Sequence, residues 1–456
     1  MSEKTESLFH SIKSPLRKKD LLPLREDTFA RIKSMRGLIE SYEEIRHMLK
    51  EEGLSPDKVY ISKSGLFPYW YIDGDAYVPV PELRKQVIQE FRVQETAEQQ
   101  KHSLKKLWDN GQYEQFYAVI HAQFAFDHYL THLDDIPTEQ RYNVFRSRYI
   151  KSEYGFQDID KSIIRGLFAS NPDRLFTKDL LTDENGYVTV YRGVEDLSAD
   201  VTQAYSWTLD FDVATKFAVR FNSEESKIYQ AQVHIDHVVD YIRRRDEEEI
   251  LVLPEHVENI HDMGFYNLDK ELIEELKKAG YIDMYQDFAF RQLKSSWFHK
   301  PEGIHGKRHI KRVLFHALLM SYLDSLSTSD TRILAYASLW HDIGRTHDYE
   351  DEGHGMKSVL KMEKLNLKGK GLTDEDLEIV KFIMIYHAIR DEVGLRKIHQ
   401  MKKIKDKDRA IDLFLRFKDC DSNDRVRLGD LDIRYLRTET GKKQLLVAYQ
   451  LLQNLE

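Results

Sequence analysis

The period of the hydrophobic pattern changes along this 456-residue chain, and this change limits the folds that the chain can adopt. Two regions, residues 59–78 and 187–253, carry short runs of aromatic and β-branched residues bounded by turn-forming residues, which predict strands. From about residue 289 to the end, apolar residues recur at three- and four-residue spacing, which predicts helices. We therefore expect a multidomain α+β protein whose last third is an all-α domain.

The individual elements follow from the same patterns. Strands are expected at residues 59–61, 69–72, 77–78, 187–192, 228–235 and 250–253. Helices are expected at residues 211–221, 269–278, 314–323, 332–340, 374–388 and 411–416. Residues 1–50 predict polar helix, and Pro81 is expected at the first position of a further helix.

Length and composition set the outer limits of the prediction. A chain of this length predicts roughly three domains, which we place at residues 1–95, 96–265 and 266–456. The 68 basic and 77 acidic residues give a net charge of −9, so the overall charge does not indicate a nucleic-acid-binding protein. The single cysteine, Cys420, excludes an internal disulfide framework and fits a reducing compartment. We find neither a membrane-spanning stretch nor a secretory signal, and expect a cytoplasmic protein without a membrane partner.

Three polar fragments follow one another in the middle segment. Arg192 ends an expected strand, Ser206-Trp207-Thr208 comes fourteen residues later, and Glu247-Glu248-Glu249 runs directly into an apolar strand. Taken singly, each fits a role in the fold: a charge at the rim of a sheet, a helix cap and an exposed turn.

In this order, residues 133–257 resemble the R-S-E class of mono-ADP-ribosyltransferases, which transfer ADP-ribose from NAD+ to an acceptor. The resemblance implies an α/β transferase domain in which Arg192 holds a phosphate or ribose of NAD+. It also implies that Ser206 and Thr208 contact the cofactor and orient the catalytic glutamate, which is Glu249. A carboxylate at that place stabilises the positive charge that develops on the ribose when nicotinamide leaves.

The pair Glu247-x-Glu249 resembles the two-glutamate form of arginine-directed transferases. The resemblance implies that Glu247 orients the guanidinium of an acceptor and helps to remove its proton. Glu248 leaves the register of the pair open by one residue. A macromolecular acceptor is expected, with protein arginine favoured and nucleic acid as an alternative.

A second site is expected in the last third of the chain. His341 and Asp342 stand side by side at the end of an otherwise apolar helix, which is costly unless a metal ion or a partner compensates them. Residues 295–435 resemble the HD phosphohydrolase superfamily, whose helical bundle binds metal through an H…HD…D set. The resemblance implies His309, within an H-x-x-R-V run, as the first ligand and Asp421 as the last, with Asp419 as the alternative.

Two further histidines, His354 and His387, match the extra ligands of binuclear members of that superfamily. A nitrogen and oxygen ligand set of this kind suits one or two divalent ions: Mn, Fe, Mg or a mixed pair. Two ions can activate water and stabilise the leaving oxygen of a phosphoester.

These resemblances predict a bifunctional enzyme, a transferase followed by a hydrolase that processes or removes the ADP-ribosyl group. A bacterial toxin, effector or phage-defence protein fits this architecture, acting in the cytoplasm or delivered into another cell. Three alternatives stay open. In the first, the hydrolase acts on a signalling nucleotide and the transferase-like domain senses NAD+. In the second, the transferase modifies nucleic acid, and in the third the protein is a degenerate binding module that uses its pockets without turnover.

Overall fold

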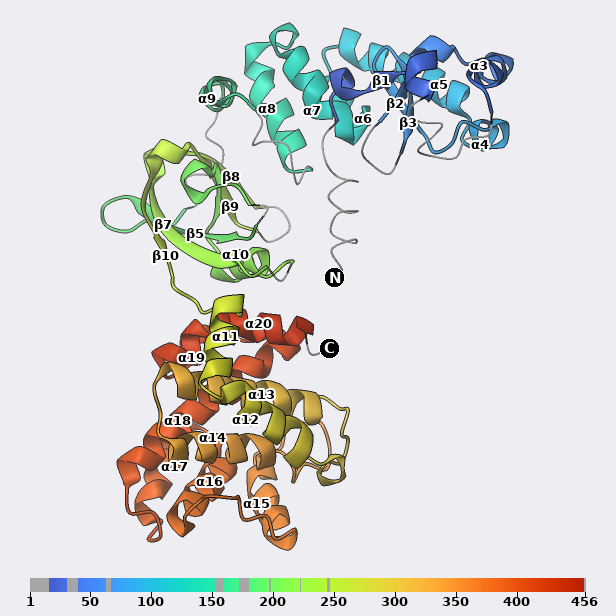
Figure 1. Cartoon of the computed structure of the whole chain (residues 1–456). Helices are drawn as coiled ribbons and strands as arrows, with labels where there is room; N and C mark the ends of the chain where they lie inside the picture. The colour runs from blue at the N-terminus through green and yellow to red at the C-terminus, as the bar shows by residue number, and fades with distance from the viewer. Residues whose placement is uncertain are drawn as a thin grey trace. The chain divides into compact units, whose positions relative to one another are not determined.

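The computed structural model describes residues 16–30, 40–62, 67–151, 159–171, 180–196, 198–221, 223–243 and 247–454. These residues form a mixed α/β structure with two antiparallel sheets and many helices (Figure 1). The chain divides into two compact units, Met1–Gly186 with His234–His256, and Tyr187–Val233 with Val257–Glu456. The division into three segments stays a prediction. Within the described ranges, no helix has both the length and the apolar character needed to cross a bilayer.

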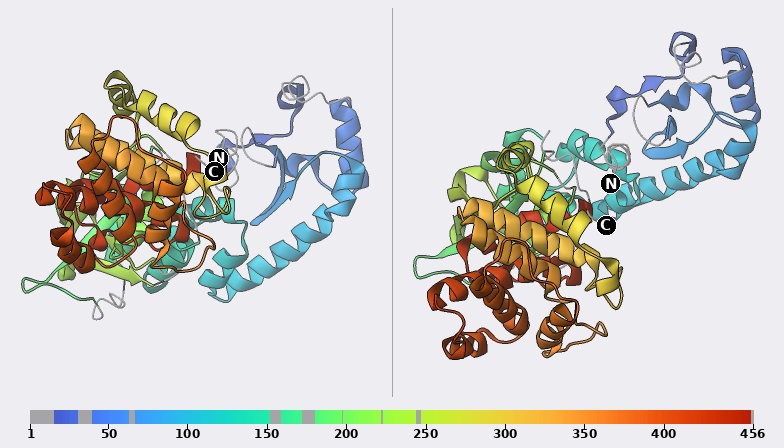
Figure 2. Two further views of the ribbon diagram at one scale, coloured as in Figure 1. Left: turned by 90° about the horizontal axis from the view of Figure 1, so that it is seen from below. Right: turned by 60° about the horizontal axis from the view of Figure 1, so that its bottom comes forward.

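The first unit contains a small antiparallel sheet with strands in the order β1 (Leu22–Pro23), β2 (Val59–Ile61), β3 (Tyr69–Asp73) and β4 (Ala76–Val80). Strands β3 and β4 are joined by a two-residue turn in which Gly74 has φ 61°, a conformation that glycine adopts without strain. The long helix α5 (Val93–Asp109) packs along β3 and β4 and extends beyond the sheet (Figure 2). Aromatic and aliphatic side chains of the sheet form a core with helix α3 (Tyr42–Glu51) and α5.

The remaining elements of this unit are helices α4 (Lys85–Glu90), α6 (Tyr113–Val119), α7 (Ala122–Thr131), α8 (Thr138–Tyr149) and α9 (Lys161–Ala169), with the hairpin β8 (Val238–Ile242) and β9 (Glu249–Val252). Helix α8 packs against α6 and α9. Its Tyr142 donates to the buried carboxylate of Asp240 in β8 at 3.0 Å, so a polar contact joins helix and hairpin.

Two expectations for this region are wrong. The helix expected from Pro81 begins at Lys85, because β4 continues through Val80 and Arg84 is still extended at φ −127°. Residues 1–50 are not helical throughout, since Leu22–Pro23 pairs with β2 as an edge strand, where a proline without an N–H is tolerated. The parts of that expected helix at residues 1–15 and 31–39 lie outside the described residues.

In the second unit, four strands follow one another in the order β10 (Val257–Asp262), β7 (Lys227–His234), β5 (Tyr187–Val194) and β6 (Ser206–Thr208). Helix α10 (Phe211–Ala218) packs on β5, and the Asp210 side chain caps it by accepting from the backbone N–H groups of Asp212 and Val213. Gly193 permits this packing, because a Cβ there would lie 1.9 Å from the carbonyl oxygen of Ala214.

The rest of the second unit is helical, as the sequence predicts, and the described residues after Asp262 contain no strand. Its helices are α11 (Lys270–Lys278), α12 (Tyr281–Gln286), α13 (Lys307–Leu323), α14 (Thr328–Trp340), α15 (His354–Lys364), α16 (Asp374–Tyr386), α17 (Asp391–Lys397), α18 (Lys407–Asn423), α19 (Glu439–Lys443) and α20 (Leu445–Asn454). Helices α13, α14, α16 and α18 pack on one another around a fully buried apolar core (Figure 1).

The close approach at Gly193 gives a prediction for stability. Gly193→Ala should lower the free energy of unfolding of its unit by about 1–3 kcal/mol, because the added methyl group meets backbone atoms that cannot rotate away. Gly166→Ala is the matched control, since a Cβ there meets nothing within 4 Å and alanine favours the helix by about 1 kcal/mol. Differential scanning calorimetry of both variants measures the difference. Equal transition temperatures for the two variants would contradict the packing.

Candidate metal centre

Five helices of the second unit bring the six metal ligands predicted from the sequence to one place. His309 lies in the first turn of α13, and Asp421 lies near the end of α18. His341 and Asp342 directly follow α14, His354 begins α15, and His387 directly follows α16. All four histidines and Asp342 are at most 5% exposed. Burial of this many polar side chains in an apolar bundle is costly unless they compensate one another or bind an ion.

The carboxylate of Asp342 lies between two pairs of histidines. Its Oδ1 is 3.0 Å from Nε2 of His354 and 3.8 Å from Nε2 of His387. Its Oδ2 is 3.6 Å from Nε2 of His309 and 3.8 Å from Nε2 of His341. Within each pair the Nε2 atoms are close together, at 2.8 Å for His354 and His387 and at 3.0 Å for His309 and His341. Each oxygen of Asp342 therefore faces its own histidine pair.

The last aspartate of the predicted set lies with the second of these pairs. Oδ1 of Asp421 is 3.4 Å from Nε2 of His309 and 3.8 Å from Nε2 of His341. The alternative, Asp419, has a different environment. Its carboxylate accepts hydrogen bonds from the backbone N–H groups of Arg437 and Thr438 and from the Thr438 hydroxyl, so it holds that segment against α18.

The other ring nitrogen of each histidine points away from the cluster and bonds to an oxygen. The four contacts from Nδ1 are His309 to Asp424 Oδ2 at 2.6 Å, His341 to Ser338 O at 2.9 Å, His354 to Asp351 O at 2.5 Å and His387 to Met384 O at 2.7 Å. A carbonyl oxygen only accepts, so Nδ1 carries a proton in His341, His354 and His387, and it is Nε2 of each ring that faces the cluster. The Nε2 atoms lie 2.8 Å apart in one pair and 3.0 Å apart in the other, close enough for both members of a pair to bind one ion. The donor set therefore fits a metal ion.

The protonation states favour the same conclusion. Burial lowers the pKa of His341 to about 3, which keeps this imidazole neutral. Burial alone would raise the pKa of Asp342, but the neighbouring His341 and the hydrogen bonds from surrounding histidines outweigh it and hold that pKa well below the usual range. In the same way, burial opposes ionisation of Asp421, yet His341 and His309 lower its pKa to about 2. Neutral imidazoles and ionised carboxylates are the forms that bind metal ions.

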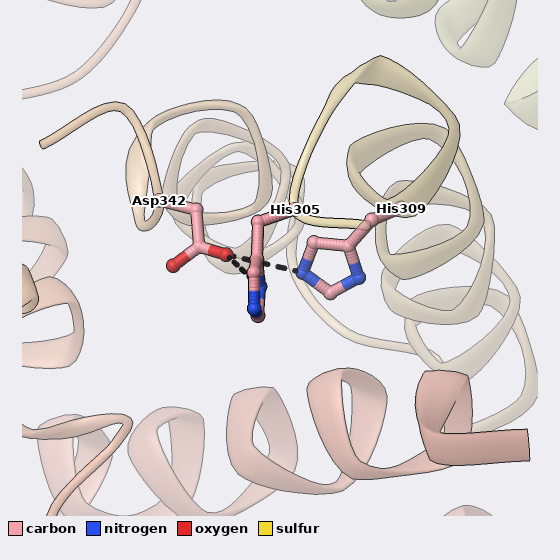
Figure 3. A group of neighbouring side chains, drawn as sticks. All are labelled: His305, His309 and Asp342. Carbon is pink, nitrogen blue, oxygen red and sulfur yellow. Dashed lines mark hydrogen bonds and ion pairs between the residues drawn. The ribbon is translucent and has the colours of Figure 1, made fainter. Parts of the chain in front are cut away.

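Three overlapping groups have ligand atoms within 4.8 Å of one another: His305, His309 and Asp342; His309, His341 and Asp421; and His341, Asp342 and His387. Figure 3 shows the first group, in which His305 and His309 both lie against the same oxygen of Asp342. Nitrogen and oxygen ligands without a thiolate suit Mn, Fe or Mg. These buried groups can hold a divalent ion.

Two residues of the centre were not assigned a role by the sequence analysis. Nδ1 of His305 lies 3.0 Å from Oδ2 of Asp342, and its side chain is 16% exposed (Figure 3). Its spacing of four residues from His309 is the signal that points to it. The second residue is Asp424, whose carboxylate contacts Nδ1 of His309 and forms an ion pair with Arg312. Arg312, the arginine of the H-x-x-R run, therefore fixes Asp424, and Asp424 in turn fixes the ring of His309.

The residues predicted for the transferase belong to both units. In the second unit, Nη1 of Arg192 donates to the backbone carbonyl of Ser206 at 2.6 Å, and Oγ1 of Thr208 accepts from the backbone N–H of Asp210 at 3.0 Å. Glu247 and Glu249 lie in the first unit, where the hydroxyl of Tyr149 donates to Oε1 of Glu249 at 2.5 Å. The placement of Arg192, Ser206 and Thr208 against the two glutamates stays a prediction.

No protein-family model matches this chain, and no curated protein or solved structure matches it either. The candidate metal centre therefore rests on its own residues and the distances between them.

The contact between Asp424 and His309 predicts a loss of metal affinity. Asp424→Asn should weaken binding by about 10–100-fold, because the ring loses the carboxylate that fixes its orientation and raises its basicity. Asp408→Asn, on the exposed first turn of α18, the helix that precedes Asp424, is the control and should bind normally. Competition with a chromogenic chelator measures both affinities. Equal affinities would show that Asp424 does not orient a ligand.

Proposed function

We propose that the chain is a bifunctional enzyme, and that its best-supported activity is metal-dependent hydrolysis of a phosphoester. One observation carries this proposal: the two oxygens of Asp342 each face a separate pair of histidines whose Nε2 atoms converge. This is the arrangement that a carboxylate shared by two ions requires. Bound divalent ions supply an activated water and charge stabilisation for the leaving oxygen.

The residues of the candidate centre are arranged around two positions. His309, His341 and Asp421 surround one position and His354 and His387 another, with Asp342 between the two. Their carbonyl and carboxylate contacts hold the rings in place before substrate arrives, which avoids a cost of reorganisation during the reaction.

His305 is suited to donate a proton. Its Nδ1 lies 3.0 Å from Oδ2 of Asp342, and its side chain is the more exposed of the two, so its ring lies at the solvent side of the centre. As the bond from phosphorus to the leaving oxygen breaks, its proton passes to that oxygen, and water supplies the new oxygen on phosphorus.

Loss of the shared carboxylate should abolish hydrolysis. Asp342→Ala is expected to lower turnover of bis(p-nitrophenyl) phosphate with Mn²⁺ by more than about 100-fold, since metal ions contribute several kcal/mol to such reactions. His399→Ala, on an exposed turn outside the cluster, should retain wild-type turnover. Metal content of the purified variants is measured alongside. Full activity in Asp342→Ala would place hydrolysis elsewhere.

A second activity, ADP-ribosyl transfer from NAD+, is favoured by two hydrogen bonds. Arg192 is fixed at the end of β5 by its bond to Ser206, so its guanidinium is held in a defined place for a phosphate or ribose. Glu249 begins β9 and is held by Tyr149, which suits a carboxylate that must face a developing positive charge. We propose a macromolecular acceptor, with protein arginine favoured through Glu247, and hydrolysis of the attached group at the metal centre. NAD+ sensing and nucleic-acid modification remain the alternatives.

The transferase proposal predicts the behaviour of three variants. Glu249→Gln should reduce transfer of label from NAD+ to lysate by at least about 100-fold, and Tyr149→Phe should reduce it less, by about tenfold, because only the orientation of the carboxylate is lost. His341→Ala should still transfer label. Separate protease and nuclease digestion then identifies the acceptor. Label released only by nuclease would overturn the protein acceptor, and full transfer by Glu249→Gln would overturn the catalytic role.

A further inference from the structure

A depression opens beside the metal centre, on the side where Arg345 and Lys300 lie. It is lined by Phe298, His299, Lys300, His305, Asp342, Arg345, His347 and Asp348. Since Asp342 lines both the depression and the metal centre, the two are continuous.

The depression presents hydrogen-bond donors that the protein leaves available. Nε of Arg345 donates to Asp342 and Nη1 donates to the carbonyl of Tyr349, while Nη2 has no protein partner among the described residues. The ring nitrogen Nδ1 of His347 is buried and has no partner in the described part of the chain. A buried polar atom without a partner is costly, and a bound polar group removes that cost. The Nη2 group of Arg345 is therefore available to donate to an anion, and so is Nδ1 of His347 in the tautomer that carries its proton there.

Lys300 adds a positive charge at the rim. Its Nζ pairs with Oδ2 of Asp348 at 2.8 Å, and the two side chains are 59% and 33% exposed. Exposed ion pairs of this kind are weak, so a phosphate, with more charge and more acceptor oxygens, can replace Asp348 as the partner of Lys300. The carboxylate of Asp348 then competes with the ligand for the same ammonium group.

We propose that Lys300, Arg345 and His347 form a second phosphate subsite, which binds one phosphate of a diphosphate substrate while the other lies at the metal centre. The proposal rests on the hydrolase function and names its substrate class: molecules with two linked phosphates, such as a nucleoside diphosphate or an ADP-ribosyl group. A substrate with one phosphate reaches the metal centre but leaves the subsite empty. The preference for two phosphates therefore comes from these side chains.

Calorimetric titration of the full-length protein in excess Mg²⁺ tests this, with ADP and AMP as probes. We expect wild type to bind ADP at least about tenfold tighter than AMP. Lys300→Met should remove most of that ratio, because the rim loses its positive charge. Asp348→Asn should increase the ratio, because the competing carboxylate is gone. If the ion pair between Lys300 and Asp348 were merely structural, both variants would change the ratio of ADP to AMP affinity in the same direction. A decrease in Lys300→Met together with an increase in Asp348→Asn is therefore specific to the subsite.

Two controls separate the subsite from folding and from catalysis. Lys405→Met, at an exposed position of the same bundle, should leave both affinities unchanged, and thermal denaturation verifies that each variant is folded. Equal binding of ADP and AMP by wild type, or a change of the same sign in Lys300→Met and Asp348→Asn, overturns the subsite. If ADP is preferred but bis(p-nitrophenyl) phosphate is not hydrolysed, the subsite stands and the hydrolase proposal fails. If bis(p-nitrophenyl) phosphate is hydrolysed but ADP is not preferred over AMP, the hydrolase proposal stands and the subsite fails.

Discussion

The buried carboxylate of Asp342 is the contact on which the geometry of the metal centre depends. Its two oxygens face different histidine pairs, so the ends of α14, α15 and α16 must meet within a few ångströms. Two glycines make this approach possible. A Cβ at Gly344 would lie 2.2 Å from the backbone nitrogen of Ser358, and one at Gly355 would lie 2.1 Å from the carbonyl oxygen of Met384. Helix α15 therefore packs backbone to backbone against both neighbours, and this packing carries His354 to Asp342.

The residues that cluster at the candidate metal centre could be predicted from the sequence, but the orientation of their side chains could not. An adjacent histidine and aspartate in an apolar helix end is conspicuous because burial makes it costly. By contrast, three of the four outer contacts use the carbonyl three residues before the histidine: Ser338, Asp351 and Met384. Every residue has a carbonyl, so no residue type marks these positions. Asp424 and His305 are side chains and were open to recognition through their spacing from Asp421 and His309.

The errors in the predicted fold have similar physical causes. Strand β10 was not expected because its six residues alternate poorly and most of them are exposed, as befits a sheet edge that has only one neighbour to pack on. The helix expected at Pro81 begins later because the β4 pairing with β3 extends to Val80 and outweighs the local preference. The choice between Asp419 and Asp421 could be made only from the structure. The two residues flank Cys420 in α18, and the helical turn between them directs Asp421 to His309 and Asp419 to the backbone of Thr438.

The two proposed activities are linked by their chemistry. Transfer of ADP-ribose leaves a pyrophosphate on the acceptor, and a pyrophosphate with one phosphorus at the proposed ions places its second phosphate next to them. The metal centre supplies the first position, and the side chains of Lys300, Arg345 and His347 supply the second. Because Arg345 also bonds to Asp342, a charge bound at the subsite acts directly on the carboxylate shared by both histidine pairs. Occupation of the proposed second phosphate position and the electrostatics of the proposed hydrolytic centre are therefore coupled through one ion pair.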